Sequence, residues 1–370
     1  MEMTLFYGSP ATDADLYYLG GFRAPDPFLA FETGGVSRAV LPPLEIGRAR
    51  RESRFDEILS DEEVKSGAGA EADLAGRILW LAARYGATGL RMAADFPARA
   101  AFALREKGDL PLEFGDRPLC PGRIRKSSGE RESIRRVNRV VSGAFREVER
   151  LLGEAEIRDG VLFLDAEPLS SERVRARIAR HCLENGCLAA GTIVAGGGQA
   201  CDPHEQGSGP LPANSLLIVD IFPCDEATGY FGDMTRTYLK GSASLDQRTL
   251  VSTVRSAQSL ALERIADGVD GRDVHEAVVK RFADAGYRTG SDGGRYRGFF
   301  HGTGHGLGLE IHEEPRVSKG SCVLGADMVV TVEPGLYYPG LGGCRIEDVV
   351  RVVPGGIEML SDHPLDWEIR

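Results

Sequence analysis

Three of the chain's seven histidines lie in one glycine-rich stretch, HGTGHGLGLEIHEEP, which spans residues 301–315. They are His301, His305 and His312. Two histidines four residues apart can bind zinc from one face of a helix. The glycines between these histidines would each cost about 1 kcal/mol in a helix, and no glutamate follows the first histidine as it does in HExxH. The sequence therefore predicts a loop or strand here, with histidines available for other chemistry.

Carboxylates interrupt several apolar segments elsewhere in the chain. They are Asp220 in LLIVDIF, Glu333 after MVVTV, and Glu347 and Asp348 in CRIEDVVRVV. A buried carboxylate is costly unless it is paired or bound to a metal. Asp233 in GYFGDMTRT follows a glycine, so on its own it is typical of a turn. Each acid taken alone leaves a structural interpretation open.

Alternating helices and strands must position these residues. Helical periodicity and serine or glycine end signals predict helices from about residue 127 and within residues 169–186, 245–268 and 271–286. Segments rich in β-branched and aromatic residues predict strands within residues 188–196, 214–223, 229–239, 327–335 and 343–353. This order is typical of an α+β domain.

The first part of the chain has a different pattern. Short apolar runs are interspersed with helical stretches such as EADLAGRILWLAARYG, where Gly86 is a C-terminal stop signal. The prolines and glycines of GDRPLCPGR then break the chain. We expect an α/β protein with two domains, residues 1–122 and 127–370.

Composition limits the classes of partner. The net charge is −11, and the most basic stretch, RIRKSSGERESIRRVNR, has the acids and spacing of a solvated helix face. Nucleic acid is therefore not expected as a partner. No run of 18 apolar residues suggests a membrane span, and MEMTLFYGSP has no signal-peptide pattern. These features predict a cytoplasmic protein that is not bound to a membrane.

Five motifs in chain order carry a family resemblance: LLIVDIFP, YFGDMTRT, HGTGHGLGLEIHE, TVEPGLYY and GCRIEDVV. Over about residues 127–370 the chain resembles the pita-bread metallopeptidases, which include methionine aminopeptidases, Xaa-Pro aminopeptidases and Xaa-Pro dipeptidases (prolidases). The resemblance implies a dinuclear metal centre with the ligands Asp220, Asp233, His305, Glu333 and Glu347. Asp233 and Glu347 would bridge the two ions, and Glu333 would also count among the catalytic residues.

The implied donor set suits hard or borderline divalent cations, because it has four carboxylates, one imidazole and no thiolate. Manganese is the first expectation, with cobalt, zinc or iron as alternatives. Two such ions would activate a bridging hydroxide to attack the scissile bond. The two aspartates, Asp220 and Asp233, lie slightly further apart than is usual in the family, so the hairpin between them is expected to carry a small insertion.

The resemblance also implies roles for neighbouring residues. His312 matches a histidine that hydrogen-bonds the reacting carbonyl, and His204, in IVAGGGQACDPHEQG, matches one that contacts the scissile nitrogen and can shuttle a proton. A phosphate loop at AGGG is not favoured, because no GK[ST] follows. Four further residues are expected to organise the site or contact substrate: His301, Arg236, Arg345 and Tyr337. For His301, a packing role is an open alternative.

The segment DADLYYLGGFRAPDPFLAFETGG resembles the creatinase-type N-terminal domain of Xaa-Pro aminopeptidases and prolidases. The resemblance implies a homodimeric exopeptidase that hydrolyses the Xaa-Pro bond at the N-terminus of short peptides. An Xaa-Pro dipeptidase is the nearest alternative. A creatinase-like enzyme or a non-catalytic binding relative is more remote, because either would have lost some of the five ligands.

Overall fold

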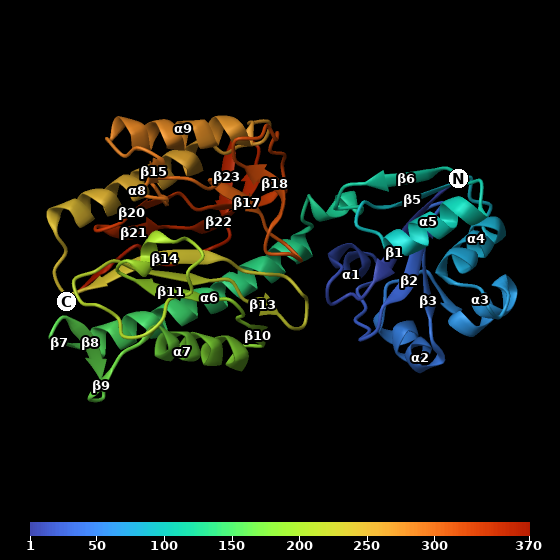
Figure 1. The fold of residues 1–370 in the computed structure, drawn as a ribbon, viewed down its shortest axis with the longest axis horizontal. Helices are drawn as coiled ribbons and strands as arrows, with labels where there is room; N and C mark the ends of the chain where they lie inside the picture. The colour runs from blue at the N-terminus through green and yellow to red at the C-terminus, as the bar shows by residue number, and fades with distance from the viewer. The chain divides into compact units, whose positions relative to one another are not determined.

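The computed structural model describes residues 1–370 apart from the side chain of Asp292. The chain divides into two units, Met1–Arg123 and Ile124–Arg370. Figure 1 shows both units as ribbons coloured along the chain. The division falls within the short segment 123–126, which lies between the two predicted domains.

The first unit is built on a six-stranded mixed sheet with the order β4-β3-β2-β1-β5-β6. Its strands are β1 (Glu2–Gly8), β2 (Phe28–Thr33), β3 (Val36–Leu41), β4 (Glu57–Ser60), β5 (Gly89–Ala93) and β6 (Leu112–Gly115). Its helices are α1 (Ala14–Gly20), α2 (Pro43–Glu52), α3 (Asp61–Ala68), α4 (Leu74–Arg84) and α5 (Ala98–Lys107), followed by the 3-10 turn η1 (Pro121–Arg123). β1, β2 and β3 are antiparallel neighbours, and the pairs β3–β4, β1–β5 and β5–β6 are parallel.

Alternation along the strands gives this sheet two apolar faces, because successive side chains point to opposite sides. Met3 and Leu5 pack in the core that includes residues of α3, α4 and α5, such as Ile78. Phe6 packs in a second core with Leu16 of α1 and residues of α2. Helices therefore cover both faces, and the first unit is a three-layer α/β domain.

The second unit begins with the long helix α6 (Ser128–Glu154). Ser127 and Glu130 form a capping box, in which each side chain accepts a hydrogen bond from the other residue's backbone N–H. The other helices of this unit are α7 (Ser171–Glu184), α8 (Leu245–Arg264) and α9 (Gly271–Asp284), with the 3-10 turn η2 (Gln199–Cys201). All four α-helices overlap the ranges expected from the sequence.

Two antiparallel sheets form the body of the second unit. The first has the order β11-β12-β14-β24, and the second has the order β18-β17-β19-β22-β23. Their strands are β11 (Ile193–Gly196), β12 (Leu217–Ile221), β14 (Met234–Lys240), β24 (Glu368–Ile369), β17 (Gly304–Gly306), β18 (Glu313–Val317), β19 (Val329–Val332), β22 (Asp348–Val353) and β23 (Gly356–Met359). Only the edge strand β24 pairs in parallel, with β14.

Smaller strands complete the second unit. They are β7 (Glu156–Arg158), β8 (Val161–Leu164), β9 (Glu167–Pro168), β10 (Cys187–Leu188), β13 (Cys224–Asp225), β15 (Gly290–Asp292), β16 (Arg295–Arg297), β20 (Gly335–Tyr338) and β21 (Gly342–Arg345). The predicted strand over residues 343–353 is therefore divided into β21 and β22, with Ile346 and Glu347 between them.

Each large sheet is covered by its own helix pair. Apolar residues of α6 and α7 form one core with the first sheet, and residues of α8 and α9 form another with the second. Figure 1 shows α6 and α7 on one side of the strands and α8 and α9 on the other. The second unit thus has two similar helix-on-sheet halves, and the strands between them carry the residues singled out above.

Candidate metal centre

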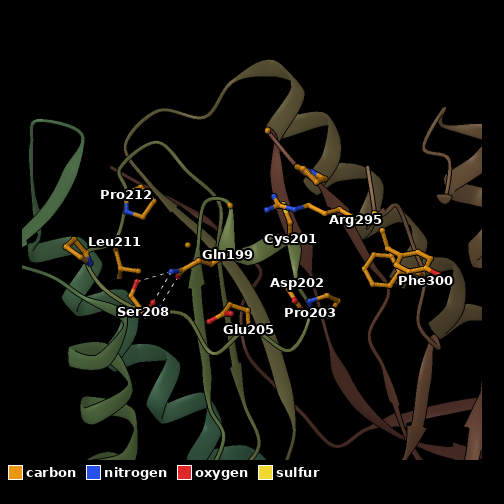
Figure 2. Close-up of a pocket in the computed structure, with 17 residues that line it drawn as sticks. Gln199, Cys201, Asp202, Pro203, Glu205, Ser208, Leu211, Pro212, Arg295 and Phe300 are labelled. Carbon is orange, nitrogen blue, oxygen red and sulfur yellow. Dashed lines mark hydrogen bonds between the residues drawn. The ribbon is translucent and has the colours of Figure 1, made fainter. Parts of the chain in front are cut away.

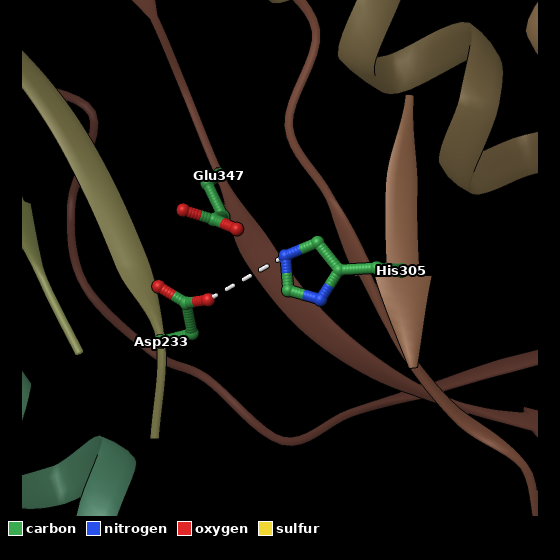
Figure 3. A group of neighbouring side chains, drawn as sticks. All are labelled: Asp233, His305 and Glu347. Atoms are coloured by element: carbon green, nitrogen blue, oxygen red, sulfur yellow. Dashed lines mark ion pairs between the residues drawn. The ribbon is translucent and has the colours of Figure 1, made fainter. Parts of the chain in front are cut away.

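Three of the five predicted metal ligands come together in the second unit. Asp233, His305 and Glu347 are all buried, and each offers a ligand atom within 4.8 Å of those of the other two. Figure 3 shows the two carboxylates facing the imidazole from separate segments, which directly precede β14 and β22. These residues lie more than 40 positions apart in sequence, so the antiparallel fold of the second unit brings them together.

The register of β12 and β14 sets the direction of the two aspartates. Asp220 pairs with Thr235 across the antiparallel ladder. Because side chains alternate, Asp233, two residues before Thr235, points to the same face of the sheet as Asp220. The connection between the strands therefore leaves both acids on one face. Asp233 is also anchored through its backbone N–H, which donates to Asn138 Oδ1 on α6 at 2.9 Å.

His305 and Glu333 come from the other half. His305 lies on the short strand β17, one of the two forms, loop or strand, that the sequence predicted. Its Nε2 is 3.6 Å from Glu333 Oε1 and 3.8 Å from Asp233 Oδ2. His305 Nδ1 faces the carbonyl oxygen of Gly306 at 3.1 Å. A carbonyl only accepts, so Nδ1 carries the proton and the Nε2 lone pair is directed at the carboxylates. An imidazole in this state is a metal ligand.

Burial and mutual repulsion disfavour the charged carboxylates. Desolvation, followed by the charges of the neighbouring acids, raises the pKa of Asp233 and Glu347 well above the usual values. Desolvation is also the largest cause that raises the pKa of Glu333 to about 7. Burial lowers the pKa of His305 to about 3. The protein alone therefore does not supply enough positive charge to stabilise all of these acids in their charged forms.

The geometry and chemistry of this group fit divalent cations. The second predicted aspartate, Asp220, has one carboxylate oxygen bonded to Arg345 and a second, Oδ1, that is buried without a hydrogen-bond partner among the described residues. A buried oxygen without a donor is costly, and a cation would satisfy it. The donors are carboxylate oxygens and one imidazole nitrogen, which suit manganese, zinc, iron or cobalt.

Arg345 connects several of the predicted residues. Its guanidinium donates to Asp220 Oδ2 at 2.8 Å, to the hydroxyl of Tyr337 at 3.0 Å and to Thr235 Oγ1 at 3.2 Å. Thr235 in turn donates to Glu347 Oε2 at 2.7 Å. Arg345 is fully buried, and it fixes the orientation of two acids through direct and relayed hydrogen bonds.

His301 has partners on both ring nitrogens. Nδ1 is 2.8 Å from the carbonyl oxygen of Gly302, and Nε2 is 2.9 Å from the Tyr337 hydroxyl. Burial is the largest cause that lowers its pKa to about 3. The neutral ring accepts a hydrogen bond from the Tyr337 hydroxyl, and the Tyr337 oxygen accepts one from Arg345. His301 is therefore placed at the end of a hydrogen-bonded chain that leads to Asp220.

Arg236 points away from the ligand carboxylates. It donates to Asp348 Oδ1 at 2.8 Å and to the backbone oxygen of Glu347 at 2.6 Å. Asp348 follows Glu347 directly and faces the opposite side of β22, so the acid next to a predicted ligand is part of a structural ion pair. Arg236 supports the backbone at Glu347 rather than its carboxylate.

Sequence reasoning did not identify Asn138 or Thr235 as site residues. Both are buried, and they hold Asp233 and Glu347 respectively. The signal for Asn138 is its position on the apolar face of α6, one helical turn from Ile134 and near Val141, where a polar residue needs a partner. No comparable signal marks Thr235, because threonine is common in strands.

Two further histidines lie close to the group of acids. The ring of His312 is perpendicular to that of His305, with 4.4 Å between centroids. His204 is exposed and lies between Pro203, whose backbone oxygen accepts from Arg345, and Glu205. His301 and His312 are thus tied to the group of acids by ring contacts or hydrogen bonds, whereas His204 lies near it along the chain.

A cavity of about 890 Å³ opens beside His204. Its walls include Asp202, Pro203 and Glu205 on either side of that histidine, together with Arg295 and Phe300. Figure 2 shows these side chains around the opening. The backbone oxygen of Pro203 accepts from Arg345 at 3.4 Å, so the cavity wall touches the residues that surround the acids. The volume is within the range of cavities that bind small molecules.

Two helix-on-sheet halves with acids and one histidine between them are the architecture expected for the pita-bread type. The model of Metallopeptidase family M24 matches residues 132–354. The chain belongs to this family, and the resemblance inferred from the five motifs is confirmed.

Individual relatives give the same result for the fold. The chain is 33% identical to an Xaa-Pro dipeptidase of Pyrococcus furiosus over 223 residues, which is 58% of this chain and 61% of the relative. It thus spans less than two thirds of that relative's length.

The solved prolidase from Pyrococcus furiosus has a TM-score of 0.79 at 25% identity, with 98% of this chain and 96% of that chain covered. An X-Pro aminopeptidase from Thermotoga maritima has a TM-score of 0.80 at 23% identity, with 100% and 98% covered, and shows the fold alone. Among the described residues, no helix has the length and apolar character needed to cross a bilayer.

Proposed function

We propose that this protein is a metal-dependent exopeptidase that hydrolyses the Xaa-Pro bond at the N-terminus of short peptides. The observation that carries the proposal is the buried convergence of Asp233, His305 and Glu347, with Glu333 3.6 Å from His305. Asp220, Asp233, His305, Glu333 and Glu347 would hold two divalent ions, with manganese as the first expectation. Bound there, such ions supply Lewis-acid activation of water and of the scissile carbonyl.

The chain's own residues supply orientation and proton transfer. Arg345 and Thr235 hold the carboxylates of Asp220 and Glu347 in fixed directions. Burial is the largest cause that lowers the pKa of His312, so its ring is neutral near pH 7 and can donate one N–H to a carbonyl oxygen. His204, which lies between the cavity-lining residues Pro203 and Glu205, would transfer a proton to the departing amine.

An Xaa-Pro dipeptidase is the second candidate, because similar proteins of Pyrococcus furiosus and Pyrococcus horikoshii carry that name. The two candidates differ in peptide length. Hydrolysis of Gly-Pro alone would favour the dipeptidase, and release of glycine from Gly-Pro-Ala would favour the aminopeptidase. Cleavage of neither peptide in the presence of manganese, by a protein that binds the metal, would contradict the proposed proline preference.

Variants separate the metal centre from general effects of charge. Glu333→Gln should reduce turnover at least 100-fold, because it removes an oxygen charge next to His305. Glu263→Gln is a matched control, since Glu263 is exposed on α8. Equal activity of both variants would contradict a role for Glu333.

Three further expectations from the sequence are retained as proposals. We propose that the first unit is a creatinase-type domain, that the protein forms a homodimer and that it acts in the cytoplasm. Light scattering of the full chain tests the homodimer: a mass of about 40 kDa, close to the 39.9 kDa of one chain, would contradict it.

A further inference from the structure

One face of α6 lines a second cavity that shares no residue with the first. Arg135, Arg139, Ser142 and Arg146 all line it, together with His363 and residues of α8, and its volume is about 780 Å³. A helix turns about 100° per residue, so these four positions fall within an arc of about 60°. The cavity therefore has an arginine-rich wall with one serine hydroxyl in its middle.

A hydrogen-bonded chain of three side chains begins at this serine. Ser142 Oγ is 3.0 Å from His363 Nδ1, and His363 Nε2 is 2.8 Å from Glu149 Oε1. The ring of Phe145 stacks on His363 with 5.0 Å between centroids, and the Tyr238 hydroxyl donates to Glu149 at 3.1 Å. Packing and hydrogen bonds therefore fix the imidazole from both sides.

The direction of the Ser142 hydroxyl differs from that of three other helical hydroxyls in this chain. Ser133, Thr249 and Thr253 each donate to the carbonyl oxygen four residues earlier. This is the common arrangement within helices. Ser142 is instead directed at His363, and Arg146 Nη1 donates to its oxygen at 3.3 Å.

The carboxylate of Glu149 determines which nitrogen of His363 carries a proton. A carboxylate only accepts, so His363 Nε2 carries the proton that is donated to Glu149. Burial raises the pKa of Glu149, but hydrogen bonds from His363 and Tyr238, together with nearby positive charge such as that of Arg146, leave that pKa below its usual value. His363 Nδ1 then has a free lone pair and accepts from Ser142. Nucleophile, base and orienting acid are thus arranged in hydrogen-bonding order.

We propose that Ser142, His363 and Glu149 form a second, metal-independent nucleophilic site for small esters that carry an anionic group. The anionic group is recognised by Arg146, because the other two cavity arginines, Arg135 and Arg139, form ion pairs with Glu132 and Glu358. Asp348 and Asp362 also line the cavity, but Asp348 is bound by Arg236. This inference goes beyond the proposed peptidase function, because it uses none of the five metal-site residues.

The reaction balances with water as the only co-reactant. Ser142 Oγ attacks the ester carbonyl as its proton passes to His363 Nδ1, and the bond to the alkoxy oxygen breaks as that proton passes to the leaving alcohol. Water then attacks the acyl-serine, gives one proton to His363, and Ser142 recovers its proton. Negative charge would develop on the ester carbonyl oxygen next to Ser142, and the nearby positive charge of Arg146, whose Nη1 is 3.3 Å from Ser142 Oγ, would stabilise it.

A fluorophosphonate reagent tests the site directly, because fluoride leaves when a serine oxygen binds phosphorus. The full-length protein, with chelator present, should gain one adduct that maps to Ser142. Labelling should be at least tenfold slower in Ser142→Ala and in Glu149→Gln, and unchanged in Ser133→Ala. The p-nitrophenyl monoester of succinic acid should release p-nitrophenol in the same rank order.

Each outcome has a distinct meaning. An unlabelled wild-type protein, or equal labelling of wild type and Ser142→Ala, would overturn the proposal and assign the three residues a packing role. Xaa-Pro cleavage with manganese should be retained by Ser142→Ala, which also verifies that the variant folds. If that variant does not fold, Glu149→Gln, which keeps the shape of the side chain, decides the matter. Labelling without any peptidase activity would support this site while contradicting the peptidase proposal.

Discussion

Gly232→Ala is the substitution for which the structure gives the clearest expectation at the metal centre. A Cβ at this position would lie 2.9 Å from both Asn138 Oδ1 and Val137 Cγ1, and 3.0 Å from the Asn138 backbone nitrogen. Real Cβ contacts are rarely shorter than about 3.4 Å. Gly232 therefore allows β14 to approach α6 closely, and a methyl group would push the two apart.

Two terms contribute to the expected cost. Overpacking a dense core costs about 1–3 kcal/mol. The separation would also lengthen the hydrogen bond from the Asp233 N–H to Asn138 Oδ1, now 2.9 Å, and a buried N–H without a partner costs about 1–3 kcal/mol. We expect a total loss of about 2–6 kcal/mol in the free energy of unfolding, with weaker metal binding because Asp233 shifts.

Urea unfolding and calorimetric titration with manganese measure both effects. Disturbing a residue that supports a ligand typically weakens metal binding about 10–100-fold. Gly153→Ala on α6 is the control, since a Cβ there meets no atom within 4 Å, and it should be neutral or slightly stabilising. If Gly232→Ala matched the wild-type protein in both stability and manganese affinity, the close approach of α6 would not position Asp233.

Three further predictions follow from buried polar groups. Arg345→Met should lower the free energy of unfolding by about 3–5 kcal/mol, because it leaves Asp220 buried and unpaired. Arg345→Lys should not restore this stability, since a single ammonium cannot replace the guanidinium fork. Thermal unfolding of both variants measures these effects. Burial, followed by the charge of Lys319, lowers the pKa of His275, so the unfolded chain takes up a proton first and stability is lost as pH falls below about 6.5. The wild-type protein should lose more stability than His275→Phe between pH 7.5 and 5 in urea unfolding, and equal slopes would contradict this. Removal of metal by chelation should lower the melting temperature and manganese should restore it, because a ligand that binds only the folded state stabilises it.

Short segments of the sequence were enough to predict the helices and strands of the second unit and to identify its site acids. The capping residues of α6 and the strand character around Asp220 and Glu333 are visible in short windows, and the glycines around His305 excluded a helix. The predicted fold class was confirmed for the same reason, because the order of helices and strands along the chain depends mainly on short-range sequence patterns.

Contacts between distant segments were not accessible in the same way. Thr235 and Glu347 are 112 residues apart, and the hydrogen bond between them depends on the pairing of two sheets. The pair Glu347 and Asp348 illustrates the limit: both acids interrupt the same apolar run, but strand alternation sends only Glu347 to the metal centre. Arg236 and Arg345 likewise flank predicted ligands, yet only Arg345 bonds a ligand carboxylate.

Anomalous diffraction from crystals of the full chain grown with manganese tests the proposed metal centre most directly. We predict two manganese peaks about 3.5–4 Å apart, both within coordinating distance of the carboxylates of Asp233 and Glu347, with His305 bound through Nε2. A map with no anomalous peak among these side chains, or with manganese bound only elsewhere, would contradict the assignment of this site as a dinuclear metal centre.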